Sequence, residues 1–458
     1  MATTMTEIQE NATAAGAAGA AGVAGHLAEF ERFQRELPAG EPGAVQALRR
    51  MAIERFAALG FPTLRQEEWR QTNVSAIAQG TFQRPQSDPD AVAAVSPELL
   101  FDAAARLVFV DGRFSARLSS VGQLPEGVIV GSLAQALQRS PEKVEPWLGQ
   151  FARFENHPFV ALNTAFLRDG AFIWVPRGAA TGLIHVLYLS SSDNDGRATV
   201  SFPRNLFVTG ENSQATIVET YAGTGPYFNC PVTELVAGPN SVVDHYKVQR
   251  ESREAFHMST FQVQADRHSV PSSHSISLGG GLVRNDVNAV LDGEGIDCIL
   301  NGLYLLEGSQ FVDNHMRVEH AKPHCASHEL YKGVLDGKAR SIFSGLIHVH
   351  KGAQKTDAKQ SNRNLLLSRD AVANSNPQLE IYADDVRCTH GSTVGQLDED
   401  AVFYLRSRGI GAEAARSLLT YAFASDIVER IKVEPVRRDL EEFLFARLPK
   451  GDVVRQAV

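Results

Sequence analysis

The feature that most constrains this chain is its middle, where short strands follow one another for more than 200 residues without a helix. From about Pro158 to Val394, segments such as Phe261–Asp266 and Ala215–Thr220 alternate apolar and polar side chains, with Gly, Asn and Asp turns between them. A doubly wound α/β fold needs helices between its strands, so the pattern excludes it and leaves a sandwich, a propeller or a β-solenoid. The sequence has no blade signature and no strict repeat length, so the pattern alone does not choose among these three.

Helical segments flank this middle on both sides. Before it, Leu27, Phe30 and Phe33 fall on one helical face, and a linker rich in Pro, Asp and Ser follows at residues 83–97. After it, helical spacing predicts helices over Glu399–Ser407, Ala412–Ile431 and Pro435–Leu448. We therefore divide the chain into a disordered Ala/Gly-rich tail (residues 1–24), an N-terminal helical region with a linker and edge strands (25–155), a β core (156–395) and a C-terminal helical domain (396–458).

Charge and cysteine content exclude several classes of protein. The net charge of -9 and the pI near 5.9 give no basic surface for nucleic acid or for an anionic membrane. The four cysteines are widely spaced, so we expect a reducing compartment and no disulfide framework. The first basic residue is Arg32, unlike a secretory signal or a transit peptide, and no apolar run could span a bilayer. We expect a cytoplasmic protein without nucleic acid or membrane partners.

One strand near the end of the β core carries two side chains that commonly bind metals. In the run Gln378–Val394 apolar and polar residues alternate, which is typical of a half-buried strand. If the alternation continues, Cys388 and His390 project from the same face. A thiolate and an imidazole side by side form a soft ligand pair that two further ligands could complete. The alternative is a buried cysteine that packs beside a hydrogen-bonded histidine.

A second candidate lies in a histidine-rich run that ends at Glu329. Its four imidazoles and one thiol belong to His315, His320, His324, Cys325 and His328. The spacing matches no standard zinc site, and successive strand residues point to opposite faces, so we favour polar turn and strand positions. His320, His324 and Cys325 are kept as additional candidate ligands. His348 and His350 also share a face; we expect them to face solvent or to be structural residues of the β core, and a ligand role is the alternative.

Several catalytic and nucleotide-binding signatures are absent from the sequence. It has no P-loop, no G-x-S-x-G motif, no kinase motif set and no Rossmann glycine fingerprint, so we expect no ATP site in this chain. A single candidate cysteine cannot supply the Cys-rich set that normally holds an iron-sulfur cluster. If a cluster forms at Cys388 and His390, a partner chain must supply the remaining ligands.

Motifs spread over most of the chain carry a resemblance to a known family. They are Phe61–Thr63 with Glu67 and Trp69, Leu330–Ile347, Gln354–Gln360, Asn364–Leu367, Leu379–Gly391, Val394–Asp398 and Phe403–Ile410. Together they resemble the SufB/SufD family of the SUF iron-sulfur cluster assembly scaffold, and the Cys-x-His strand favours the SufD type. The resemblance implies a right-handed parallel β-helix for the core, with strand edges that can pair with another subunit.

The resemblance also implies partners and roles. It implies a non-catalytic subunit that pairs with SufB through the β-helix, binds the ATPase SufC through the C-terminal helices and supports iron acquisition. Cys388 would be a thiolate ligand or sulfur relay and His390 an iron ligand, for iron or a transient cluster shared with SufB; a flavin is a further candidate on the complex. The SufC contact would use Phe403, Tyr404, Arg406, Arg408, Tyr421 and Phe423. The alternatives are a β-helix polysaccharide-processing enzyme and a stand-alone metal-binding module using His315–His328.

Overall fold

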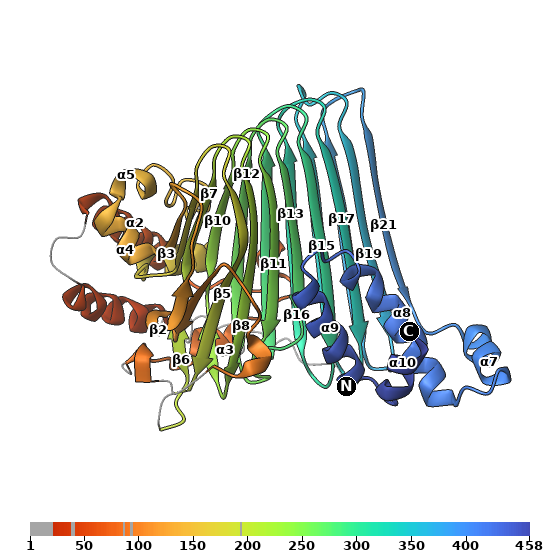
Figure 1. Ribbon diagram of the computed structural model, residues 1–458. Helices are drawn as coiled ribbons and strands as arrows, with labels where there is room; N and C mark the ends of the chain where they lie inside the picture. Colours follow the sequence, from red (N-terminus) through yellow and green to blue (C-terminus); the bar gives the residue numbers. More distant parts are fainter. Residues whose placement is uncertain (1–21, 38–41, 86–87, 92–94, 193–194) are drawn as a thin grey trace.

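The core of the protein is a parallel β-solenoid whose strands form two long sheets (Figure 1). The computed structural model describes residues 22–37, 42–85, 88–91, 95–192 and 195–458. Through the core, successive strands of the chain alternate between the two sheets, so neighbours within a sheet come from successive turns. The expected fold class, a mostly β core with helices before and after it, is confirmed, and of the three β architectures left open the solenoid is the one adopted.

The two sheets hold nearly all strands. The ten-stranded sheet contains, in spatial order, β2 (Arg113–Val121), β1 (Ala105–Val110), β5 (Ala180–Ser191), β8 (Gln214–Thr224), β11 (Val242–Arg250), β13 (Val270–Ser277), β15 (Asp297–Leu306), β17 (Ala326–Leu335), β19 (Asp357–Leu366) and β21 (Arg387–Gly395). The eleven-stranded sheet contains β20 (Val372–Ile381), β18 (Arg340–Val349), β16 (Phe311–His320), β14 (Leu282–Leu291), β12 (Phe256–Ala265), β10 (Val232–Ala237), β7 (Arg204–Thr209), β4 (Ala171–Val175) and β3 (Ile129–Ser132), with β6 (Thr199–Ser201) and β9 (Tyr227–Asn229) beside β12. All pairs are parallel except β1 with β2 and β3 with β4.

The repeat of the solenoid is regular only over part of its length. Strands β14, β16 and β18 begin at residues 282, 311 and 340, a spacing of 29 residues, whereas β20 begins at residue 372, 32 residues after β18. The longer connection between β18 and β19 accounts for part of this change, because residues 350–356 separate them while residues 321–325 separate β16 and β17. A search for one fixed repeat length therefore does not find these turns.

Side chains that point into the solenoid form continuous rows, because residues in register on parallel strands point to the same side. One row contains Tyr188 on β5 and Tyr221 on β8, whose rings stack 4.8 Å apart. Other rows are polar: the Nζ of Lys247 lies 2.7 Å from Oδ1 of Asn285, and the buried Glu251 lies 2.7 Å from His257. The interior is thus filled by aromatic and aliphatic residues that enclose hydrogen-bonded polar groups.

Helices cover the early turns of the solenoid. They are a helix over residues 22–36, then α2 (Gly43–Leu59), α3 (Ser75–Gln79), α4 (Leu133–Arg139), α5 (Pro141–Val144) and α6 (Pro158–Ala165), with the single turns η1 (Glu67–Trp69), η2 (Pro89–Ala91) and η3 (Pro97–Leu99). Gly60 follows α2 with a φ of 65°, which glycine adopts without strain. The tail expected over residues 1–24 lies outside the described residues, except residues 22–24, which are helical.

The segment Gly60–Val74 belongs to the N-terminal region (residues 25–155) that was expected to be helical, and the structure corrects this expectation for the segment. It contains only the single turn η1 and irregular backbone, because its residues are held by contacts with the solenoid. The guanidinium carbon of Arg284 lies 3.8 Å from the centroid of the buried Trp69 ring, and Thr72 donates a 2.6 Å hydrogen bond to Oδ2 of Asp313. Trp69 is therefore a packing residue that fixes the segment to β14, while Thr72 fixes it to β16.

A small helical domain follows the last strand. It contains α7 (Glu399–Ser407), α8 (Ala412–Val428), α9 (Glu434–Arg447) and α10 (Gly451–Ala457), of which the sequence predicts the first three and misses α10. Ile427 and Leu440 are buried in one cluster with Leu303 of the solenoid, and Lys332 forms a 2.7 Å ion pair with Asp426. In the described part of the chain no helix is long and apolar enough to cross a membrane.

Candidate functional site

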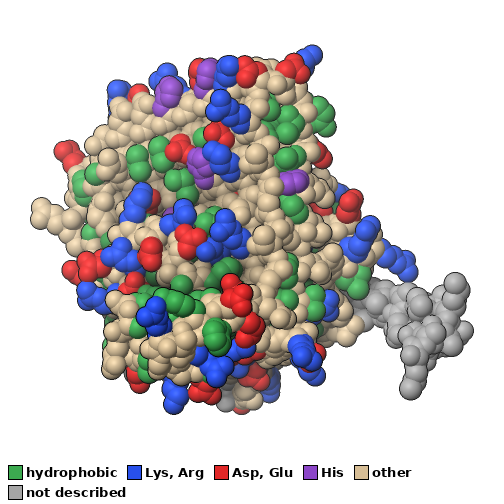
Figure 2. Space-filling model, turned by 90° about the vertical axis from the view of Figure 1, so that its right-hand side faces the viewer, with side chains coloured by type: hydrophobic (Ala, Val, Ile, Leu, Met, Phe, Trp, Pro, Cys, Tyr) green, Lys and Arg blue, Asp and Glu red, His purple; other side chains and the backbone are tan. Residues whose placement is uncertain are grey.

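The last turn of the solenoid ends in two strands that have a neighbour on one side only. β20 pairs with β18 and β21 pairs with β19, and the described chain adds no strand beyond either of them. The exposed large apolar side chains of these two strands are Val372, Ile381 and Val394. Figure 2 faces this end and shows hydrophobic and histidine side chains exposed among charged ones. The open end thus combines apolar surface with unpaired backbone.

The free edges of these two strands differ in their hydrogen-bond donors. Backbone amides alternate between the two edges of a strand. Arg387 donates its amide to the β19 side, so the amides of residues 388, 390, 392 and 394 point to the free edge of β21. On β20 the amide of Val372 donates to the β18 side, which places Pro377 at a free-edge position without an N–H. β21 therefore presents an unbroken row of donors, whereas proline interrupts the row on β20.

Cys388 and His390 lie on β21 and point into the open end of the solenoid. They are in register with Ala358 and Gln360 of β19, both buried inside, so the two side chains share one face. The sequence predicts one strand through Gln378–Val394, but residues 382–386 separate β20 from β21, so the shared face comes from the two-residue spacing within β21 alone. Cys388 is half-buried against an apolar cluster that contains Ile347, and burial raises the pKa of its thiol. His390 is exposed because no later turn covers it. The structure thus brings together the two ligands predicted for this strand.

The three additional candidate ligands point in different directions. His320 is fully buried, its Nε2 lies 2.9 Å from the Ser327 hydroxyl, and burial lowers its pKa to about 4. The Cys325 thiol is also buried and donates to the carbonyl of Gly293 at 3.1 Å. His324 occupies an exposed turn with a φ of 60°. The three do not form one site, and among the described residues no group of three His, Cys, Asp or Glu side chains is arranged to hold a metal.

His348 and His350 lie on the outside of the eleven-stranded sheet. Nδ1 of His348 is 2.9 Å from Glu380 and Nε2 of His350 is 2.6 Å from Glu319, while the two rings are 4.8 Å apart. Both histidines are therefore engaged with carboxylates at the surface, on the opposite side of the sheet from the solenoid interior. This agrees with the expected solvent-facing position.

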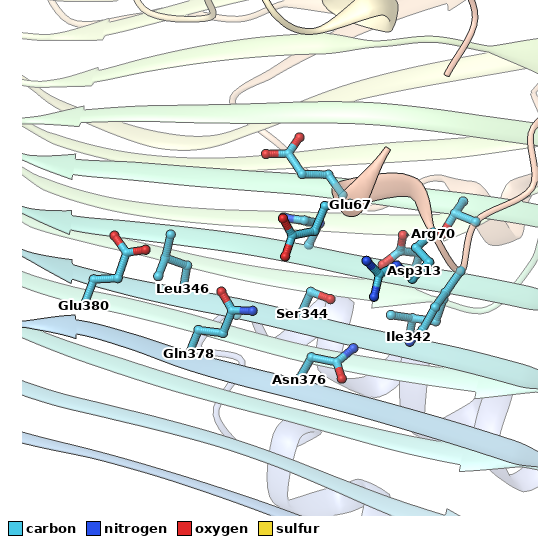
Figure 3. Close-up of a pocket in the computed structure, with 14 residues that line it drawn as sticks. Glu67, Arg70, Asp313, Ile342, Ser344, Leu346, Asn376, Gln378 and Glu380 are labelled. Atoms are coloured by element: carbon cyan, nitrogen blue, oxygen red, sulfur yellow. Dashed lines mark hydrogen bonds between the residues drawn. The ribbon is translucent and has the colours of Figure 1, made fainter. Parts of the chain in front are cut away.

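A polar groove of about 410 Å³ runs across the outer face of β16, β18 and β20, beneath η1 (Figure 3). Figure 3 shows Asn376, Gln378 and Glu380 spaced along β20, with Glu67 above them. The groove lies outside the solenoid, whereas Cys388 and His390 point inside it, so the groove and the predicted ligand pair are separate features. No motif in the sequence points to this groove.

The residues expected to contact SufC fall into two groups. On α7, Phe403 is 70% exposed and Tyr404 57%, and the guanidinium of Arg408 lies over the Tyr404 ring; Arg406 is on the same helix. On α8, the Tyr421 ring stacks on Phe445, and the Nζ of Lys332 lies 4.7 Å from the Phe423 ring centroid. The α7 group is therefore available to a partner, while the two α8 rings make internal contacts.

Comparison with known proteins adds family membership to this geometry. Residues 25–182 match the SufBD protein N-terminal region, and residues 189–423 match the SufBD core domain of the SUF system for FeS cluster assembly. The chain belongs to the SufBD family. Family members act in iron-sulfur cluster assembly, which supports a scaffold role for this chain in the SUF system.

Curated relatives of the SufBD family align with most of the chain. An iron-sulfur cluster assembly SufBD family protein of Synechocystis sp. is 35% identical over 413 residues, which cover 87% of this chain and 90% of the relative. The iron-sulfur cluster assembly protein SufD of Escherichia coli is 28% identical over 402 residues, covering 87% of this chain and 92% of the relative. SufD of Bacillus subtilis is 28% identical over 339 residues, covering 71% and 75%.

Proposed function

We propose that this chain is the SufD-type subunit of an iron-sulfur cluster assembly scaffold and that SufB pairs with it along the free edge of β21. The observation that carries the proposal is the position of Cys388 and His390 on that strand, which has free backbone donors along its whole edge. A partner strand added to this edge would lie directly beside both side chains. Protein pairing and ligand assembly would then happen in one step.

The ligand set of this chain is incomplete, which supports a shared site. A thiolate and an imidazole suit iron, and an iron-sulfur cluster needs further ligands, for which SufB cysteine and acidic side chains are the expected source. Here iron or the nascent cluster is cargo. Because burial raises the pKa of the Cys388 thiol, it stays protonated in the isolated chain and loses its proton when a metal binds. Cys388 acts in this proposal as a thiolate ligand or sulfur relay and His390 as an iron ligand.

The C-terminal helical domain is the proposed docking site for the ATPase SufC. The support is the exposed pair Phe403 and Tyr404 on α7, a helix that buries only Val402. Aromatic residues exposed on a short helix are typical anchors of a protein interface. Arg406 and Arg408 would contribute charge at its rim, and Tyr421 and Phe423 would support it from α8.

The expectations for catalysis, localisation and cofactors are part of the same proposal. The chain itself is non-catalytic, works in the cytoplasm and supports iron acquisition as part of an ATPase-driven complex, with a flavin as a candidate on the assembled complex. Membership of the SufBD family favours this scaffold over the polysaccharide-processing enzyme and the stand-alone metal module. The stand-alone metal module is also disfavoured because His320, His324 and Cys325 point in different directions.

The test is co-purification with SufB and SufC. Wild type is compared with the double variant Cys388→Ser/His390→Ala, and with Thr389→Ala, whose side chain lies between the two on the opposite face of β21. We expect all three to form the complex and only the double variant to lose the cluster after anaerobic reconstitution. Unchanged cluster content in the double variant would make both residues structural. A stoichiometric cluster bound to the isolated chain would contradict the shared site.

A further inference from the structure

A row of polar side chains lies directly behind His390 inside the solenoid. His390 on β21 is in register with Gln360 on β19, and Gln360 is in register with Glu329 on β17. Because residues in register on parallel strands point to the same side, the three side chains follow one another inward from the open end. Gln360 and Glu329 are each only 3% exposed. Neither residue is a site residue predicted from the sequence.

The amide of Gln360 is held on two sides. Its Nε2 donates a 2.9 Å hydrogen bond to Oε2 of Glu329. On the facing sheet, Gly345 leaves the space that the amide fills, because a Cβ at this position would lie 2.3 Å from Nε2 and 2.6 Å from Cδ of Gln360. Gly345 has no positive φ that would itself favour glycine. The missing side chain at position 345 is therefore explained by the room that Gln360 needs.

The oxygen of the same amide has no hydrogen-bond partner among the described residues. Oε1 of Gln360 is buried, and Oε1 of Glu329 behind it also has none. A buried acceptor without a donor loses the hydrogen bonds that water would supply, so such an atom is seldom left unsatisfied in a folded protein. Since Nε2 is directed to the β17 side, a donor from the β21 side is the one that fits, and the residue in register there is His390.

We propose that Gln360 is a positioning residue for His390, whose ring donates an N–H to Oε1 of Gln360. This inference rests on the proposed function of His390 as an iron ligand. An imidazole has one N–H in its neutral form, so the hydrogen bond fixes the tautomer and directs the other nitrogen, with its free lone pair, to the open end. Hydrogen bonds of this kind orient metal-binding histidines in many proteins. Glu329 holds the amide from behind.

The hydrogen bond would orient the His390 ring before the partner strand and the iron bind. His390 is exposed, and without a fixed partner its ring would sample both tautomers and several rotamers. With Gln360 as acceptor, the ligand nitrogen is already oriented when a partner strand arrives at the edge of β21. The ordering entropy of the ring is then lost before the iron binds, which increases affinity.

The test uses histidine-labelled protein and nitrogen NMR of the imidazole rings in the isolated chain, with the His390 signals assigned by their loss in His390→Ala. We expect one dominant tautomer in wild type and a mixture of both in Gln360→Met. Asn362→Leu is the matched control, because it also removes a buried amide from the inner face of β19 but lies in register with Ser392. In the SufB complex, we expect iron affinity to fall about tenfold in Gln360→Met.

A second variant covers the case in which Gln360→Met does not fold. Gly345→Ala leaves Gln360 in place but crowds its amide, and we expect the same mixed tautomer. An unchanged tautomer in either folded variant would overturn the positioning role. If the tautomer responds while His390→Ala keeps its cluster, Gln360 positions His390 and the proposed ligand role fails. If His390→Ala loses the cluster and the tautomer does not respond, the ligand role stands and this inference fails.

Discussion

The two ends of the solenoid interior are filled in opposite ways. At the first end, one interior row begins with Phe109 on β1, which stacks 5.0 Å from Tyr188, which in turn stacks on Tyr221. Every ring in this stack is buried. At the last end, the inner face of β21 carries Cys388, His390, Ser392 and Val394. Large aromatic rings thus close one end, and small or polar side chains leave the other open.

The two ends also differ in whether other parts of the chain cover them. The first end finishes in strands that turn antiparallel, β2 beside β1 and β3 beside β4, and helices α4 and α5 cover the outer face of the nearby strands β4, β7 and β10. The last end has no such cover in the described chain. Because a solenoid turn cannot bury both of its faces alone, an end without a cap is normally completed by something else. The contrast is consistent with a first end that stabilises the fold and with a last end that is the proposed surface for a partner.

The largest loss of stability is expected from a substitution of Phe109 at the first end. Its ring is fully buried, and we expect Phe109→Ala to lower the free energy of unfolding by about 3–5 kcal/mol through lost burial and a cavity. Val394→Ala at the other end should change it by no more than about 0.5 kcal/mol, because Val394 is 47% exposed. Denaturant unfolding of the two isolated variants measures both. Equal losses would mean that the two ends are equally packed.

Glu329 allows a pH test of the interior behind the open end. Burial raises the pKa of Glu329 to about 7, so the folded chain holds a proton that the unfolded chain releases near pH 4.5. Stability from this group is therefore present at low pH and lost as pH rises to 7, by roughly 3 kcal/mol. We expect Glu329→Gln to gain that amount over wild type between pH 5 and pH 8 in denaturant unfolding. A difference independent of pH would show that Glu329 is ionised throughout.

The free edge of β21 can be tested by removing a single donor. The amide of Ser392 points away from β19, so we expect Ser392→Pro to change stability by about 1 kcal/mol or less and to abolish co-purification with SufB. Thr393→Pro is the matched control, because its amide belongs to the internal ladder and its loss should destabilise the fold by about 3 kcal/mol. Normal SufB binding by Ser392→Pro would rule out pairing through this edge.

The smallest effect on the isolated chain is expected at α7. Phe403→Ala/Tyr404→Ala should leave the free energy of unfolding within about 0.5 kcal/mol of wild type, because both rings are exposed. The same double variant should lose SufC in a pull-down while it keeps SufB. Retention of SufC would place its docking site elsewhere on the helical domain.

The sequence predicts the strand-rich core but does not predict its winding. Alternation indicates a strand from local residues alone, whereas a solenoid is defined by which distant strands lie side by side. The spacing of 29 residues changes to 32 just before β20, so no single period is present to reveal the turns. Helix α10 is missed because it is a short segment that follows Pro449 and begins at Gly451, and proline and glycine normally signal the end of a helix.

In the candidate site, too, relations within one strand can be predicted from the sequence, whereas contacts between strands cannot. That Cys388 and His390 share a face follows from a two-residue spacing within one strand. That Gln360 lies behind His390, and that Gly345 makes room for Gln360, depends on register between strands and on the facing sheet, which alternation does not contain. His320 and Cys325 are near in sequence to His324, yet a turn with positive φ directs His324 outward while both others are buried.

The central claim is that a partner strand completes the open end beside Cys388 and His390, and hydrogen exchange tests it most directly. Exchange of the β21 amides is measured by mass spectrometry in the isolated chain and in the complex with SufB, with the β1 and β2 strands as internal reference. We predict that the peptide over residues 387–395 becomes strongly protected in the complex while the β1 and β2 peptides do not change. Unchanged exchange over residues 387–395 in a stable complex would contradict the account.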